Sequence, residues 1–449
     1  MPARVIAAVK PILLAAARHI RAAYRLAREA WKLRHDLGWR GLAVRAVRRL
    51  TGTRPPDPDA PAKYGAPVRG AEFDVIYAIG FWPGAPKRYR VFNIAEGLAA
   101  AGYAVHVMDF DRIDDIRRYR WRATALVLFR AEYNRWTGIS DVLRYARDAG
   151  MRVVYDIDDL VFDPRFADSI DAMRRMPRAE RRRSIEEMKR RRELLLACDL
   201  CTLSTAPLAR IAERFGRPAF VIPNSINAQQ LRVAAELVAM PPRRREGIVI
   251  GYFSGTATHQ RDFAQCEPAL LDIMARHPEV RFRPVGRFDL GPEWARYRER
   301  IERIGFLAPA ELLRCVAETD INLAPLEIGN PFCEGKSELK FFEAALVGVP
   351  TVASGTEPFR DAIDDGISGF LARDTDEWRR ALELLILSES RRRAVGAAAK
   401  AAALARFSLA AVIPVAISAL GLRQPATAQP TPSSLSGAAR RLPGLDPAA

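Results

Sequence analysis

The sequence predicts an α/β protein with two Rossmann-like domains that face each other across a cleft, preceded by an N-terminal amphipathic helical arm. Three observations support this fold class. Apolar strand-like runs alternate with helix-like segments, the alternation restarts near residue 247, and basic residues concentrate before residue 55. A chain of 449 residues has room for two such domains and their extensions.

The composition shifts divide the chain into six parts. They are a basic amphipathic arm (1–54), a linker (55–70), an N-terminal Rossmann-like domain (71–235), a C-terminal Rossmann-like domain (236–405), a C-terminal helix (406–422) and a disordered tail (423–449). The linker contains the Pro/Asp-rich run "PPDPDAP", and the tail is rich in Pro, Ala and Ser.

The arm carries most of the net charge of +17. Residues 1–54 hold thirteen Lys or Arg against two acids, which leaves only +6 for the rest of the chain. This balance argues against a nucleic-acid partner for the two domains. Apolar residues from Val9 to Trp31 recur at helical spacing beside a row of arginines. That pattern predicts a helix lying on an anionic membrane surface, the alternative being a helix packed on the protein's own body.

The arm fits neither a spanning helix nor a signal peptide, because arginines interrupt every apolar run in it. The cysteines fit a reducing cytosol. Cys198 and Cys201 form the single CxxC pair, which lacks the second pair that a zinc site needs, so we expect ordinary interior cysteines.

In the first half, the expected strands are "FDVIYAIG" (73–80), "AVHVMDF", "ATALVLFR" (123–130), "RVVYDIDDLVF" and "CDLCTLST". Helices are expected over 90–103, over "ISDVLRYARDAG", as one long charged stretch over about 166–197, and around 206–215. In the second half, strands are expected at "GIVIGYFSG" (247–255), "VRFRPVG", "INLAPL" and "PTVAS". The helices between them are expected at "FAQCEPALLDIMARH", "PAELLRCVAETD" and "SELKFFEAAL". Ligands of such folds bind at the carboxyl ends of the strands.

The stretch "INLAPLEIGNPFCEGKSELKFFEAAL" looks at first like an ATP-binding P-loop, since a strand and a Gly-Lys-Ser loop precede a helix. The spacing does not fit, because five residues instead of four separate Gly329 from Gly335. A helix start with two lysines four residues apart, Lys336 and Lys340, is still suited to phosphate oxygens.

The order of these segments resembles glycosyltransferase family 4, a retaining family with the GT-B fold. The resemblance covers about 72–405 and is carried by "RVFNIAEGLAAAGYAVHV", by "CDLCTLSTAPLARIAERFGRPAFVIPNSIN" and, most specifically, by "FFEAALVGVPTVASGTEPFRDAIDDGISGFLA". It implies a C-terminal domain that binds a nucleoside-diphosphate sugar, an N-terminal domain that binds the acceptor, and no metal or other cofactor.

The resemblance implies roles for residues of the C-terminal domain. Glu343 would bind the ribose hydroxyls of the donor, and Lys336, Ser337 and Lys340 would bind its diphosphate. The family commonly has a second glutamate earlier in this motif, where this chain has Gly335. Either Glu334 serves instead as a catalytic residue near the sugar, or the chain follows a subgroup of the form N-x-F-x-x-x-K-S-x-x-K-x-x-E.

The loop "GYFSGTATHQRDF" departs from the family in a second place, where many relatives have an arginine and a lysine for the diphosphate. Here the candidates for donor binding are Gly255, Thr256, His259 and Arg261, with Arg261 taking the task of the lysine. His259 could equally be a polar cap.

Four acids in "YDIDDLVFD" follow a strand of the N-terminal domain. A DxD motif would suggest a metal, which conflicts with the predicted two-domain fold. We expect instead that Asp156, Asp158 and Asp159 face the cleft and contact the acceptor, with Asp158 as the catalytic candidate. The alternative is a helix cap with solvated acids.

Three arginines of the N-terminal domain, Arg88, Arg90 and Arg130, could contact a phosphate of the donor or of a lipid acceptor, or could be surface charges. No histidine is placed as a convincing base. A retaining mechanism tolerates this, because the departing phosphate can take the proton of the acceptor.

The sequence therefore predicts a retaining, hexosyltransferase-like enzyme that moves a sugar from a nucleoside-diphosphate sugar to a glycan or lipid-linked glycan. We expect it to work in bacterial surface polysaccharide or glycolipid assembly, on the inner face of the plasma membrane. The alternatives are a nucleotide-sugar epimerase of the same fold and a non-catalytic glycan-binding scaffold.

Overall fold

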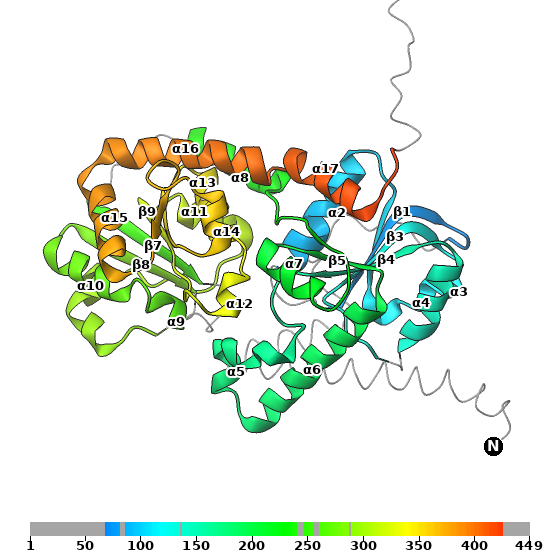
Figure 1. Cartoon of the computed structure of the whole chain (residues 1–449). Coiled ribbons are helices and arrows are strands. Elements are labelled where there is room, and N and C mark those ends of the chain that lie inside the picture. Colours follow the sequence, from blue (N-terminus) through cyan, green and yellow to red (C-terminus); the bar gives the residue numbers. More distant parts are fainter. Residues whose placement is uncertain are drawn as a thin grey trace, which may run out of the picture.

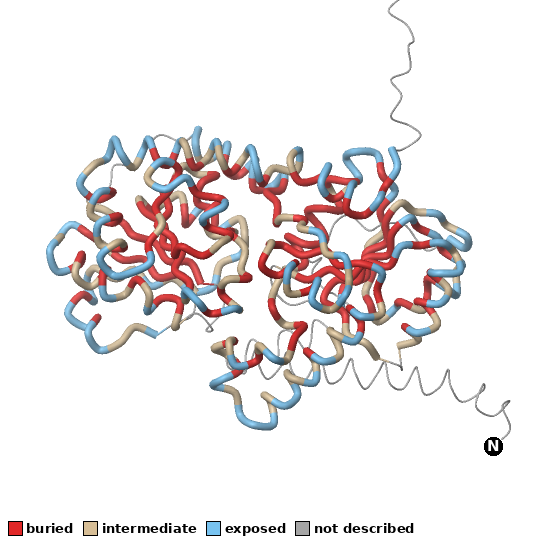
Figure 2. Tube along the Cα trace, viewed as in Figure 1, coloured by how far each residue is buried: buried red, intermediate tan, exposed pale blue. Residues whose placement is uncertain are grey.

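A computed structural model describes residues 68–80, 86–134, 137–239, 247–254, 260–286 and 289–424. The predicted helical arm (1–54), most of the linker and almost all of the predicted tail lie outside these residues. The described chain forms two lobes side by side, each built around a parallel sheet (Figure 1). Helices cover both faces of each sheet, and the strands between them are almost entirely buried (Figure 2).

The first lobe contains a six-stranded sheet in the order β2-β1-β3-β4-β5-β6. Its strands are β1 (Glu72–Ile79), β2 (Val105–Asp109), β3 (Arg122–Phe129), β4 (Arg152–Ile157), β5 (Leu200–Leu203) and β6 (Ala219–Val221). Alternate residues of β1 enter two separate cores, because successive side chains of a strand point to opposite faces. Both faces are apolar, as expected for a parallel sheet covered on both sides.

The helices and helical turns of this lobe follow the strands in sequence. They are η1 (Arg88–Phe92), α2 (Asn93–Ala100), η2 (Phe110–Arg112), α3 (Asp115–Arg118), α4 (Ile139–Asp148), η4 (Pro164–Ser169), α5 (Asp171–Arg175), α6 (Arg178–Ala197) and α7 (Ala206–Glu213). The next helix, α8 (Ala228–Ala239), packs on the second lobe (Figure 1). The expected single helix over 166–197 is wrong. Helix α5 ends at Arg175 and α6 begins at Arg178. Met176, between them, has an extended backbone, because a residue that precedes a proline, here Pro177, disfavours the helical conformation.

The second lobe contains a five-stranded sheet in the order β11-β10-β9-β7-β8. Its strands are β7 (Ile248–Ser254), β8 (Val280–Gly286), β9 (Ile321–Ala324), β10 (Thr351–Ser354) and β11 (Phe370–Ala372). Gly286 has a positive φ of 96°, and a Cβ atom there would lie 1.8 Å from the backbone oxygen of Ser254. Only glycine therefore lets β7 and β8 end side by side.

The helices of the second lobe are α9 (Gln260–Phe263), α10 (Glu267–Arg276), η5 (Pro292–Arg300), α11 (Pro309–Val316), α12 (Pro331–Glu334), α13 (Leu339–Leu346), α14 (Glu357–Ala362), α15 (Thr375–Leu387) and α16 (Glu389–Phe407). The expected continuous helix over 263–277 is interrupted between α9 and α10. Pro268 lies in the first turn of α10, where its missing N–H costs nothing.

The chain returns to the first lobe at its described end. After Ser408, α17 (Leu409–Leu420) packs against α2, and the two helices approach closely at Gly97. A Cβ atom on Gly97 would lie 2.4 Å from Cδ1 of Ile413, so the glycine makes room for α17. Helices α16 and α17 together run across both lobes (Figure 1), which ties the lobes to each other.

Candidate functional site

The segment between β9 and α13 lies against the first lobe, at the carboxyl end of the second sheet. Asn330 caps α12, since its Oδ1 accepts a hydrogen bond from the backbone N–H of Phe332 at 3.0 Å. Its Nδ2 donates to the backbone oxygen of Ser169 in the first lobe at 2.9 Å. Thr205 also reaches across, donating to the oxygen of Gly335 at 2.9 Å. The predicted donor loop is therefore held between the lobes.

Lys340 has its ammonium buried in the second lobe. Its Nζ lies 4.5 Å from the ring centroid of Tyr252 and has no hydrogen-bond partner among the described residues. Burial lowers the pKa of Lys340 to about 8, the charge of Asp262 opposes that shift, and the charge of Lys336 adds to it. A buried cation with an incomplete set of partners is costly unless an anion joins it.

Lys336 lies one helical turn before Lys340 in sequence and is half-buried. Its Nζ lies 4.8 Å from the ring centroid of Phe332. The electrostatic effect of Lys336 on the pKa of Lys340 shows that the two ammonium groups share one region. Two cations at the carboxyl end of a parallel sheet form an environment suited to a polyanion.

Glu343 lies on α13, three residues after Lys340. Its Oε1 accepts hydrogen bonds from the hydroxyl of Tyr89 and, at 3.4 Å, from Nε2 of Gln230. Burial raises the pKa of Glu343 to about 7, although the bond from Tyr89 and the charge of Lys340 oppose that shift. Near neutral pH the carboxyl group of Glu343 is therefore present in both its protonated and its ionised form, and the ionised form can accept hydrogen bonds from hydroxyl groups.

A hollow of about 10 Å³ lies beside these groups, with a lining that includes Arg88, Tyr89, Gln230 and the start of α11. This volume is about that of one water molecule. The first lobe thus covers the neighbourhood of Glu343 closely.

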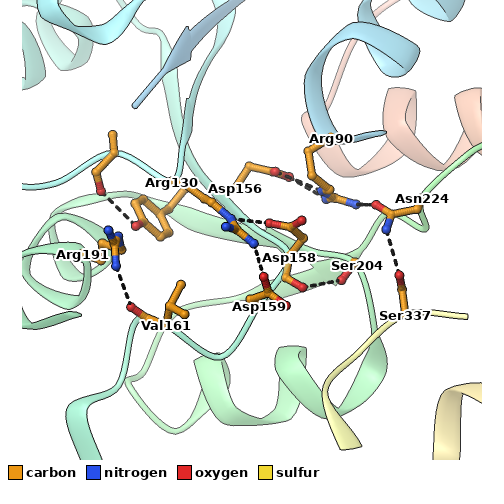
Figure 3. A network of polar contacts seen from close by, with 12 residues as sticks. Arg90, Arg130, Asp156, Asp158, Asp159, Val161, Arg191, Ser204, Asn224 and Ser337 are labelled. Carbon is orange, nitrogen blue, oxygen red and sulfur yellow. Dashed lines mark hydrogen bonds and ion pairs between the residues drawn. The ribbon is translucent and has the colours of Figure 1, made fainter. Parts of the chain in front are cut away.

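A polar network at the carboxyl end of the first sheet continues to this loop (Figure 3). The buried guanidinium of Arg90 forms two bonds to Asp156, at 3.1 and 2.6 Å, and donates to Oδ1 of Asn224 at 3.4 Å. Asn224 in turn donates to Oγ of Ser337 at 2.9 Å, and Thr202 donates to Asp156 at 2.7 Å. Arg90 and Asp156 therefore satisfy one another and connect the first sheet to the donor loop.

Arg130 joins two of the other predicted acids. It follows β3 with a positive φ of 45°, which is uncommon for a residue with a side chain. Its Nε donates to Asp158 at 2.5 Å and its Nη2 to Asp159, and both carboxylates accept from it directly (Figure 3). Burial raises the pKa of Asp158, while the charge of Arg130 opposes that shift. The three predicted residues form one ionic cluster, in which Arg130 is buried and the two carboxylates are partly exposed.

Glu334 and Gly335 occupy the position where the sequence departs from the resembled family. Both carboxylate oxygens of Glu334 accept from backbone N–H groups, of Gly329 at 3.1 Å and of Glu357 at 3.3 Å. A Cβ atom on Gly335 would lie 2.8 Å from Cδ2 of Leu208 in the first lobe. A side chain at residue 335 would therefore have to displace the end of the Leu208 side chain.

The remaining predicted residues have other partners or lie outside the described ranges. Arg261 forms an ion pair with Glu327, and Arg88 with Glu96 at 2.7 Å. Gly255, Thr256 and His259 lie outside the described residues. In the part of the chain that the structure describes, no three His, Cys, Asp or Glu side chains are grouped to hold a metal ion. Cys198 and Cys201 are free and buried.

Sequence reasoning missed Tyr89, Gln230, Asn224 and Asp262. Tyr89 stands between two arginines that were singled out, and Gln230 follows the segment "NSIN", but neither residue type signals a role by itself. Asp262 directly follows Arg261, and its carboxylate accepts from the backbone N–H of Glu327 at 3.2 Å. Contacts between segments that are distant in the chain are needed to single these residues out.

Two parallel α/β sheets, a loop held between them and a C-terminal helix that returns to the first lobe define the GT-B fold. Crystal structures of known proteins share this arrangement. A glycosyltransferase from Rickettsia africae has a TM-score of 0.52 and 11% identity, with 78% of this chain and 98% of that chain covered. Sucrose-phosphate synthase from Thermosynechococcus elongatus has a TM-score of 0.51 and 14% identity, with 77% and 98% covered.

A third structure, of Anabaena Alr3699/HepE in complex with UDP, has a TM-score of 0.48 and 14% identity, with 78% of this chain and 99% of that chain covered. In sequence, residues 263–414 match the profile of a family described as "Glycosyl transferase-like". That range contains the whole segment from β9 to α13. Among curated proteins, none matches the sequence significantly.

Proposed function

We propose that the protein is a retaining glycosyltransferase that moves a sugar from a nucleoside-diphosphate sugar to a hydroxyl of a glycan or lipid-linked glycan. One observation carries this proposal. The ammonium of Lys340 is buried without a hydrogen-bond partner among the described residues, in the segment that also holds Lys336 and Glu343. A diphosphate would supply hydrogen-bond acceptors and negative charge beyond that of Asp262, and the similarity of 263–414 to glycosyltransferases favours a nucleotide sugar as its source.

In this proposal Glu343 accepts hydrogen bonds from the two ribose hydroxyls, while Lys336 and Lys340 bind the diphosphate. The two cations stabilise the charge that develops on the leaving group as the bond from C1 of the sugar to the phosphate oxygen breaks. The acceptor oxygen forms its bond to C1 on the same face, and its proton passes to a phosphate oxygen of the leaving group. No side chain is then needed as the base.

Donor entry requires the two lobes to separate. Tyr89 of the first lobe and Gln230 of α8 donate hydrogen bonds to Glu343, so the ribose hydroxyls replace protein donors when they bind. A hinge between lobes is a common way to admit a ligand.

The first lobe supplies the acceptor side. The cluster of Arg130, Asp158 and Asp159 lies at the carboxyl end of its sheet, where a hydroxyl acceptor would be positioned. The arm at 1–54 would hold the protein at the inner face of the plasma membrane, where bacterial surface polysaccharides and glycolipids are assembled. Within the described residues, no helix is long and apolar enough to cross a membrane.

The test is release of nucleoside diphosphate from a panel of nucleotide sugars, with and without a membrane extract that supplies acceptors. We expect one donor to be consumed by the wild type and the turnover to be lost in Glu343→Ala and Lys336→Ala. Lys400→Ala on α16 is the matched control and should keep full turnover. Binding of a nucleotide sugar without any turnover would favour the scaffold, and turnover to an isomeric nucleotide sugar would favour the epimerase.

A further inference from the structure

Helices α5 and α6 form a hairpin that projects from the first lobe, below the body of the protein in Figure 1. Residues 171–192 contain ten Lys or Arg and four Asp or Glu, a net charge of +6. This equals the whole net charge of residues 55–449, so the rest of that part is balanced. The excess positive charge of the described lobes is concentrated in this hairpin.

The outer half of the hairpin contributes little to a core. The residues of α6 that are buried are Met188, Leu194 and Leu195, all in its second half. None of the first ten residues of α6 is fully buried, although Ile185 packs against an apolar cluster of the hairpin, and this stretch lies along the more exposed part of the tube in Figure 2. This outer stretch therefore gains little stability from apolar burial and presents most of its charged side chains to the solvent.

The arginines of α6 fall into two groups. At the inner end, Glu132 pairs with Arg190 at 2.9 Å and with Arg191 at 2.8 Å, which fixes the hairpin to the lobe. At the outer end, Arg178 and Arg182 are exposed and have no carboxylate partner among the described residues. They lie four residues apart on one helical face, where like charges repel each other. An anionic partner would remove this repulsion.

The base of the hairpin touches the donor loop. A small apolar cluster of Ile170, Met173 and Met188 packs against Phe332 of α12. The ring of Phe332 also lies under the ammonium of Lys336. The base of the hairpin is therefore packed directly against the segment proposed to bind the donor.

We propose that the α5–α6 hairpin docks on an anionic lipid surface, with Arg178 and Arg182 facing the headgroups. A convex, projecting shape fits a broad charged surface better than a small ligand, which needs a concave site. This contact is separate from the arm at 1–54 and orients the junction of the lobes toward the membrane. The lipid contact rests on the proposed function as a membrane-bound transferase. Because lipid binding is measured without any sugar donor, a failure of the lipid contact can be distinguished from a failure of the proposed transferase activity.

The experiment uses the full-length chain with vesicles of pure phosphatidylglycerol and of pure phosphatidylcholine. Ala179, exposed beside Arg178, is replaced in A179C and labelled with an environment-sensitive fluorophore, because the native cysteines are buried. A label at S390C, exposed on α16, is the control for position. We expect the A179C label to respond to the anionic vesicles only and the S390C label not to respond.

Charge reversal tests the same contact. R178E/R182E should weaken binding to the anionic vesicles at least about tenfold, since each basic residue at such a surface contributes roughly 1 kcal/mol. R303E/R380E changes the charge equally on the second lobe and should leave binding within about twofold. Equal binding by wild type and R178E/R182E, equal losses in both variants, or a response of the A179C label to soluble polyphosphate would each overturn the proposal.

Discussion

Tyr89 of the first lobe donates a hydrogen bond from its hydroxyl to the carboxylate of Glu343 in the second lobe, 254 residues further along the chain. The pKa of both groups is raised by burial, and Glu343 reaches about 7. The residue with the best-defined proposed role is thus occupied by the opposite lobe when no donor is present. A ribose that binds Glu343 must replace this hydrogen bond, so ribose binding is coupled to separation of the lobes.

The first prediction concerns the pH dependence of donor binding. Ribose hydroxyls donate to the ionised form of Glu343, so affinity should fall about tenfold per pH unit below 7, where the carboxyl is protonated. Above about pH 8 affinity should fall again, because Lys340 loses its proton. Calorimetry with a nucleoside diphosphate from pH 5 to 9 should give a maximum between about 7 and 8.

Two variants assign the acid limb of that profile. Glu343→Gln should weaken binding and abolish the fall below pH 7. Tyr89→Phe removes a hydrogen bond that lowers the pKa of Glu343, so its acid limb should move to higher pH. An acid limb that persists in Glu343→Gln would show that another group is responsible.

The second prediction concerns the stability cost of Lys340. Its ordinary pKa is 10.5, and burial lowers it to about 8 in the folded protein. Between these values the unfolded chain holds the proton and the folded one does not, so stability rises with pH there. Below pH 8 the full cost remains, up to about 3 kcal/mol. Lys340→Met should therefore be more stable than wild type at pH 7 in urea unfolding, with the difference vanishing above about pH 10.

Lys336→Met is the matched control for this measurement. Its side chain is half-buried and near the same loop, but it should gain no comparable stability at pH 7. Both variants should lose affinity for the diphosphate by at least about tenfold. A Lys340→Met protein that is less stable than wild type at pH 7 would contradict the interpretation of Lys340 as an unneutralised cation.

The third prediction concerns the buried ion pair of Arg90 and Asp156. Their side chains are 0% and 4% exposed, so Asp156→Asn leaves the guanidinium buried beside a neutral group. Removal of one partner from such a pair costs about 3–5 kcal/mol. Urea unfolding of Asp156→Asn should show a loss of this size. Asp272→Asn breaks an exposed pair with Arg276 and should cost less than about 1 kcal/mol.

The fourth prediction separates two roles for Glu334. Because both of its carboxylate oxygens accept backbone N–H groups, we expect it to position the donor loop. Glu334→Gln keeps one acceptor oxygen, so KM for the donor should rise several-fold and kcat should change less than about tenfold. A loss of kcat of about a thousandfold or more, with KM unchanged, would instead assign it the direct catalytic role that the sequence suggested.

The strands and helices that could be predicted are those that local sequence patterns specify. Strand and helix periodicity depends on neighbouring residues, so nine strands and the helices that connect them were expected, whereas β6, β11 and the helices α14, α15 and α16 were not. The two helices that were expected as continuous, over 166–197 and 263–277, are interrupted near Pro177 and Pro268, where proline geometry outweighs a favourable composition. Lys336 and Lys340 were singled out because they lie four residues apart at the start of a helix, and Glu343 because the segment resembles a glycosyltransferase motif.

The sequence by itself determined the alternation of strands and helices, the restart that makes two domains, and the loop with two lysines and a glutamate. Only the tertiary structure decided which charges are already satisfied. The sequence gives no reason to distinguish Asp156 from Asp158 and Asp159. In the structure, Asp156 pairs with Arg90, whereas Asp158 and Asp159 pair with Arg130. Burial and pairing depend on segments distant in the chain, and those quantities set the cost of a charge, so no local pattern could distinguish the occupied carboxylates from the unneutralised ammonium of Lys340.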